Sequence, residues 1–110
     1  MRELKSKERP TATQVMLAEL DRRRVALHAL GFRPAFYDCA TCSLHPSRHA
    51  DGRAAQSHVL DGLPDAVVVV RSDCGRVIAV RASLIAGFER KGFFYTEAAA
   101  RRAAREWKSP

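Results

Sequence analysis

The sequence predicts an α+β fold, with a single compact domain over residues 11–108. Three observations predict it: an amphipathic stretch near the N-terminus, two β-branched runs around a short turn, and an alanine-rich stretch near the C-terminus. The chain has 110 residues, the length of one domain. Hydrophobic residues make up 46% of it, which excludes a wholly disordered chain.

The N-terminal part predicts a flexible basic tail over residues 1–10 and then a long helix over about 12–30. Thr11 and Gln14 have the spacing of a capping box, so the helix begins after Thr11. Leucines recur on one face at 3.6 residues per turn, and we expect Leu20 and Leu27 to be buried.

The middle of the chain predicts a small antiparallel sheet built on a β-hairpin. Its strands are expected at about 66–72 and 76–82, with Asp73, Cys74 and Gly75 in the turn between them. Residues 32–37 have the content of a strand, but Pro34 favours an edge strand or an extended loop. Residues 53–60 fit a short helix or a strand equally well.

Two helices are predicted at the C-terminus. Ser83 is placed to cap a helix over 84–91 that Gly92 ends, and Thr96 is placed to cap a helix over 97–107. Alanines and a tryptophan form the packing stripe of the last helix: Ala100, Ala103, Ala104 and Trp107.

The net positive charge of the chain indicates a negatively charged binding partner. Nineteen Lys and Arg against twelve Asp and Glu give a formal net charge of +7, and most of the basic residues are arginines. Arginine binds phosphates and carboxylates in a bidentate manner, which fits a nucleic acid or an acidic protein surface. The candidate phosphate contacts are Arg101, Arg102 and Arg105 on the last helix. A solvated surface of that helix is the plainer interpretation. Residues 93–95 fit either a base-stacking platform or the core.

The cysteines predict a zinc site. An odd number of three cysteines and no secretory signal argue against a disulfide framework, and we expect a reducing cytoplasmic location. Cys39 and Cys42 have the Cys-x2-Cys spacing of zinc ligands, and His45 and His49 complete a tetrahedral set if Pro46 opens a helical turn. His58 and Cys74 are the alternates for the last two ligands.

These patterns predict a non-enzymatic basic domain with a structural zinc ion that acts as a nucleic-acid-binding or regulatory accessory protein. The alternatives are a protein–protein interaction module or homodimer, and an enzyme that uses Cys39 or Cys42 as a thiol. No apolar run approaches the length of a membrane span, so no membrane partner is expected.

Overall fold

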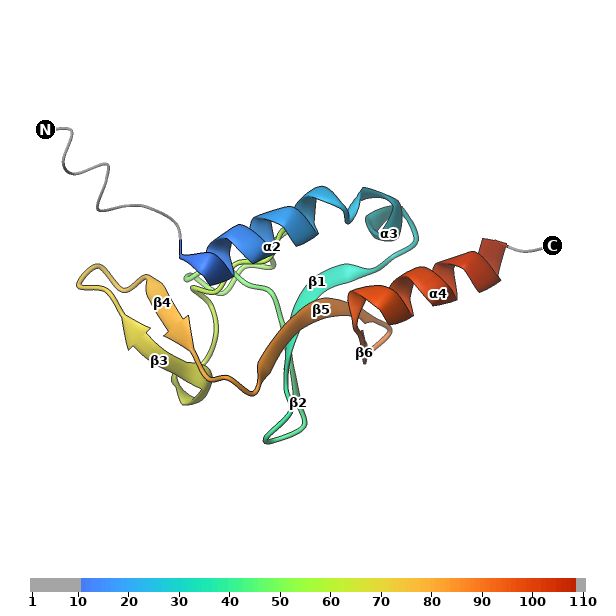
Figure 1. Cartoon of the computed structure of the whole chain (residues 1–110). Helices are drawn as coiled ribbons and strands as arrows, with labels where there is room; N and C mark the ends of the chain where they lie inside the picture. The colour runs from blue at the N-terminus through green and yellow to red at the C-terminus, as the bar shows by residue number, and fades with distance from the viewer. Residues whose placement is uncertain (1–10, 109–110) are drawn as a thin grey trace, which may run out of the picture.

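Helix α2 (Ala12–Arg22) begins at the capping box that the sequence predicts. The Thr11 hydroxyl accepts a hydrogen bond from the Gln14 backbone N–H at 3.1 Å, and the Gln14 side chain accepts one from the Thr11 N–H at 2.9 Å. The computed structural model describes residues 11–108 (Figure 1), so the predicted tail over residues 1–10 lies outside the described residues.

The predicted long helix is two helices, α2 and α3 (Val25–Ala29). The backbone tightens between them, because the N–H groups of Arg23 and Arg24 donate to carbonyls only three residues back, at 3.1 and 3.3 Å. The Arg101 guanidinium binds the Arg23 carbonyl oxygen at 2.6 Å and so stabilises the break. Leu20 and Leu27 are buried on either side of it, as predicted.

The main sheet has four antiparallel strands in the order β2–β1–β5–β6. The strands are β1 (Arg33–Asp38), β2 (Ser43–Pro46), β5 (Leu84–Arg90) and β6 (Phe93–Tyr95). The predicted helix over 84–91 is therefore wrong, because that segment is the inner strand β5. The Ser83 hydroxyl caps no helix and donates instead to Asp38 at 2.6 Å.

The first strand is not at the edge that its proline predicted. β1 lies between β2 and β5, and its Pro34 is buried. Pro34 lies opposite Ser47, just beyond β2, and its carbonyl accepts from the Ser47 N–H at 3.0 Å. The Ser47 carbonyl, which an ordinary residue at position 34 would bind, accepts instead from the Ala55 N–H at 3.0 Å. The missing donor of Pro34 therefore leaves no orphaned acceptor.

The predicted hairpin is confirmed as β3 (Val68–Arg71) and β4 (Val77–Val80), preceded by the 3₁₀ helix η1 (Asp65–Val67). The prediction that the antiparallel sheet is built on this hairpin is wrong, because β3 and β4 form a separate two-stranded sheet. Its turn is closed by a hydrogen bond of 2.8 Å from the Ser72 N–H to the Arg76 carbonyl. Gly75 has a φ of +89°, a conformation that suits glycine. The predicted last helix is confirmed as α4 (Glu97–Lys108), and the Thr96 hydroxyl accepts from the Ala99 N–H at 3.1 Å.

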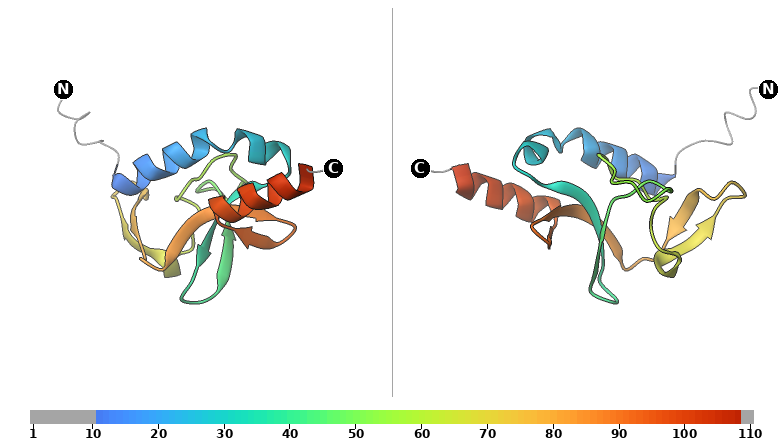
Figure 2. Two further views of the ribbon diagram at one scale, coloured as in Figure 1. Left: turned by 45° about the vertical axis from the view of Figure 1, so that its right-hand side comes forward. Right: turned by 180° about the vertical axis from the view of Figure 1, so that it is seen from behind.

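The helices pack on one face of the main sheet, and the β3–β4 hairpin lies beside the start of α2, away from α4 (Figures 1 and 2). One core cluster joins the helices to the sheet through Leu20, Leu27, Phe32, Phe88, Ala100 and Ala104. A second joins α2 and β1 to the hairpin through Leu17, Phe36, Leu60, Leu63, Val67 and Val77. These clusters leave the β1–β2 turn and the β5–β6 turn outside the core.

Candidate functional site

Two cysteines lie together in the turn between β1 and β2. Asp38 and Ser43 form the last pair of the two strands, and Cys39 and Cys42 are the first and last residues of the four-residue loop between them. Both side chains are exposed. The pKa of Tyr37 is raised, mainly by the interaction of its hydroxyl with the Cys42 side chain and less by Cys39. Both sulfurs therefore lie near the same phenol group.

The carboxylate of Asp38 holds this loop in place. It is buried and accepts hydrogen bonds from the Ser83 hydroxyl at 2.6 Å, the Thr41 hydroxyl at 2.9 Å and the Ala40 N–H at 3.1 Å. These bonds, that from Ser83 most of all, hold the pKa of Asp38 below its usual value. The Cys39 N–H also donates to the Ser83 carbonyl at 2.9 Å, so the loop is tied to the chain just before β5.

The other predicted zinc ligands do not join this cysteine pair. No group of three His, Cys, Asp or Glu residues within 11–108 is placed to hold one metal ion. Pro46 opens no helical turn, because it is the last residue of β2. His45 pairs with Phe36, so it lies on the opposite face of the sheet from Tyr37 and Cys42. His49 follows in the next loop, and Cys74 is in the other hairpin.

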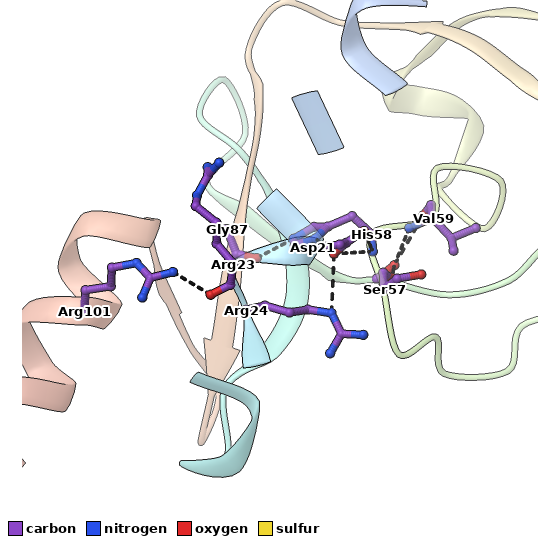
Figure 3. Close-up of polar contacts among 9 residues, drawn as sticks. Asp21, Arg23, Arg24, Ser57, His58, Val59, Gly87 and Arg101 are labelled. Atoms are coloured by element: carbon purple, nitrogen blue, oxygen red, sulfur yellow. Dashed lines mark hydrogen bonds and ion pairs between the residues drawn. The ribbon is translucent and has the colours of Figure 1, made fainter. Parts of the chain in front are cut away.

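His58, an alternate ligand, is engaged in a buried network (Figure 3). Its Nδ1 lies 2.7 Å from Oδ1 of Asp21, and its Nε2 lies 2.7 Å from the Gly87 carbonyl oxygen. Its backbone N–H also donates to the Asp21 carboxylate, at 3.0 and 3.1 Å to the two oxygens. Both ring nitrogens are thus occupied, and neither is free for a metal. The network instead links α2 to β5. Sequence reasoning missed it, because Asp21 and His58 are far apart in the chain and share no motif.

The predicted phosphate contact Arg101 is bound within the domain (Figure 3). Its guanidinium lies 3.0 Å from Glu97, and Arg23 lies 2.9 Å from the same carboxylate. The hydrogen bond from Arg23 and then that from Arg101 lower the pKa of Glu97 to about 2. Arg101 therefore ties α4 to the end of α2. The other two candidates, Arg102 and Arg105, have exposed side chains.

Aromatic and basic side chains meet where β5 and α4 end. Phe93 and Trp107 are 69% and 45% exposed, although both are large and apolar. Arg90 adjoins both residues: it pairs in register with Phe93, and its guanidinium carbon is 4.4 Å from the centroid of the Trp107 ring. Lys91 is exposed in the adjoining turn. We call these four residues, Arg90, Lys91, Phe93 and Trp107, the aromatic–basic corner.

The turn of this corner places a lysine in a conformation that few side chains adopt. Lys91 and Gly92 are the two residues between β5 and β6, and their φ angles are +55° and +87°. Two-residue turns with positive φ at both positions favour asparagine or glycine. A lysine at position 91 therefore costs backbone free energy that asparagine or glycine would not cost there, and the turn itself does not require a lysine.

A groove of about 710 Å³ lies between α2, residues 58–61 and the turn of the β3–β4 hairpin. Cys74 lines it and hydrogen-bonds with the Ser72 hydroxyl at 3.2 Å. This bond is the main reason that the pKa of Cys74 is lowered. The apolar wall includes Leu17 and Val77.

Comparison with protein-family models, with curated proteins and with solved structures finds no match to this chain. Within the part of the chain that the structure describes, no helix is long and apolar enough to cross a membrane.

Proposed function

We propose that this chain is a non-enzymatic accessory domain that binds single-stranded nucleic acid through the aromatic–basic corner. The observation that carries the proposal is the grouping of Arg90 with two exposed aromatic residues: Phe93 is its register partner, and its guanidinium lies over the Trp107 ring. Proteins that bind single strands combine aromatic rings, on which bases stack, with cations that contact the backbone phosphates. An isolated exposed ring would be unremarkable, whereas two exposed aromatic residues grouped with an arginine supply both parts of that chemistry.

The surrounding charge supports the same proposal. Lys91 keeps an exposed positive charge in the turn, although its positive φ disfavours lysine. Arg102 and Arg105 add cations on the exposed side of α4. With a net charge of +7, the chain attracts polyanions over a distance set by the ionic strength.

Trp107 is the one tryptophan of the sequence, so its fluorescence reports directly on the corner. We expect single-stranded DNA or RNA to quench this fluorescence at low salt, and the affinity to fall by at least about tenfold between roughly 50 and 200 mM salt. Phe93→Ala removes one stacking ring and should weaken binding by about five- to 100-fold. The matched control is Val69→Ala, since Val69 is 61% exposed on β3, away from the corner.

Lys91→Asn separates binding from stability. Asparagine fits the positive φ of the turn better than lysine, so this variant should melt at the same or a higher temperature while it binds more weakly. Arg53→Asn is the control, because it removes one charge from an exposed side chain in the 47–60 loop. The proposal is overturned if no strand at micromolar protein and low salt changes the fluorescence, or if both corner variants bind as their controls do.

A further inference from the structure

The Cys39–Cys42 loop has the form of half a metal site. Its two thiols stand at the ends of one four-residue turn, and both are open to solvent. A soft divalent ion such as zinc takes thiolate ligands in tetrahedral sets of four. Two ligands from one turn of a hairpin fill two of the four corners.

The loop is organised before any metal binds. The Asp38 carboxylate receives three hydrogen bonds from the loop and from Ser83, and the Cys39 N–H is bound to the Ser83 carbonyl. Cys42 adopts a φ of +57° within this frame. Because the loop is tied at both ends, a metal ion that binds there orders few further groups and loses little of its binding free energy to conformational entropy.

The described part of the same chain does not supply the other two ligands. Among residues 11–108, no third His, Cys, Asp or Glu lies with the pair in a metal-binding group. His45 is on the opposite face of the sheet, His58 uses both ring nitrogens, and Cys74 lies in a separate hairpin. The β1–β2 hairpin also extends away from the helices (Figure 1), so its tip is open to another molecule.

We propose that two copies of this chain bind one zinc ion between their β1–β2 turns, with Cys39 and Cys42 of each copy as the four ligands. Four Zn–S bonds form, and the four thiol protons are released to the solvent. The site carries a net charge of −2 from one Zn²⁺ and four thiolates. This charge offsets part of the repulsion between two chains that each carry +7. The metal site is separate from the aromatic–basic corner, so the proposal does not depend on nucleic-acid binding.

The experiment uses the reduced, metal-free full chain and adds Zn²⁺ or Co²⁺ alone. We expect uptake to end at one metal ion for two chains, and the mass in solution to rise from 12.2 kDa to about twice that value. Co²⁺ should give the intense charge-transfer absorption of a tetrahedral thiolate site. A chelator should return the protein to a monomer.

Cys39→Ser and Cys42→Ser should each abolish the metal-dependent dimer and the cobalt spectrum while circular dichroism stays unchanged. Cys74→Ser is the matched control and should retain both, since Cys74 is also exposed but lies in the β3–β4 turn. One metal ion per monomer, no uptake at micromolar Zn²⁺, or a dimer that persists without metal would each overturn the proposal. If Cys39→Ser does not fold, the cobalt spectrum and the stoichiometry of the unchanged chain decide it alone.

Discussion

Strand β5 and the β3–β4 hairpin differ in how well the local sequence predicts a strand and in where that strand lies in the fold. The hairpin is rich in valine and isoleucine, yet Val69 and Ile78 are 61% and 43% exposed. β5 mixes leucine, isoleucine and phenylalanine with alanine, glycine, glutamate and arginine, and its Phe88 is 1% exposed between two neighbouring strands. The hairpin follows from local β propensity, whereas β5 is a strand because β1 and β6 pair with it. The difference shows that the strongest local strand signal in this chain lies outside the main sheet.

The comparison is tested most directly by truncating one residue in each region. Phe88→Ala leaves a cavity in the cluster that joins the helices to the sheet, so we expect a loss of about 3–5 kcal/mol in the free energy of unfolding. Val69→Ala should change it by under about 0.5 kcal/mol, because the side chain is mostly in solvent. Urea denaturation of both variants measures the two values. Equal losses would mean that the hairpin is as much a part of the core as β5.

The segment 84–91 was predicted as a helix for reasons that are local. Its residues include several good helix formers, and Ser83 and Gly92 have the spacing of a cap and a stop. The alternation of the strand is present, with Ala86 and Phe88 on the inner face and Gly87 on the outer face, but seven residues are too few for the period to decide. Gly87 marks the strand only through a tertiary contact, because a Cβ atom there would collide with the Tyr95 carbonyl oxygen of β6. This contact cannot be inferred from the sequence, because it depends on the position of β6 beside β5.

The candidate site residues likewise fall into two groups: those that local spacing brings together and those whose positions depend on the tertiary structure. Cys39 and Cys42 were predicted together, and the structure places them in one loop, because a spacing of three residues is a local property. His45, His49, His58 and Cys74 needed long-range placement to join them, and the strand pairing takes them elsewhere. Arg101 was predicted as a phosphate contact from charge alone. Its pairing with Glu97 four residues earlier on α4 is a local pattern, but its bond to the Arg23 carbonyl depends on how α4 packs against α2.

A smaller loss of stability is expected when the link between β5 and α2 through His58 is weakened. Asp21→Asn weakens the bonds to the His58 ring and backbone, and a buried polar group that loses a charged partner typically costs about 1–3 kcal/mol. Glu19→Gln is the control, since Glu19 lies on the same helix in an exposed pair with Arg22. If thermal melts show equal stability for the two variants, the network does not hold the helix on the sheet.

The link between α4 and α2 predicts a pH dependence. The pKa of Glu97 is about 2 in the folded chain, against an ordinary value of 4.5, so the contribution of this carboxylate to stability is complete above about pH 4.5 and is lost as the pH falls toward 2. Glu97→Gln should therefore lower the stability by about 1 kcal/mol at neutral pH, because the carboxylate is 26% exposed and partly screened. The deficit should shrink toward pH 2. Glu106→Gln, on the exposed side of α4, is expected to show no such trend.

The smallest effect is expected at the attachment of the hairpin to the rest of the domain. Asp61 accepts a hydrogen bond from the Val77 N–H at 3.0 Å and lies 3.7 Å from Arg76, so it ties the start of β4 to the loop before η1. Asp61→Asn keeps an acceptor but removes the charge, and we expect a loss of under about 1 kcal/mol.

Hydrogen exchange distinguishes where that loss falls. A two-stranded hairpin is marginal by itself, so its amides should exchange by local opening, and Asp61→Asn should speed exchange in β3 and β4 several-fold. The amides of β1 and β5 should keep their rates, because they are protected by a different set of pairs. Equal acceleration in both sheets would mean that the two unfold as one unit. The contrast between an exposed local hairpin and a buried strand would then apply to their solvent exposure but not to their stability.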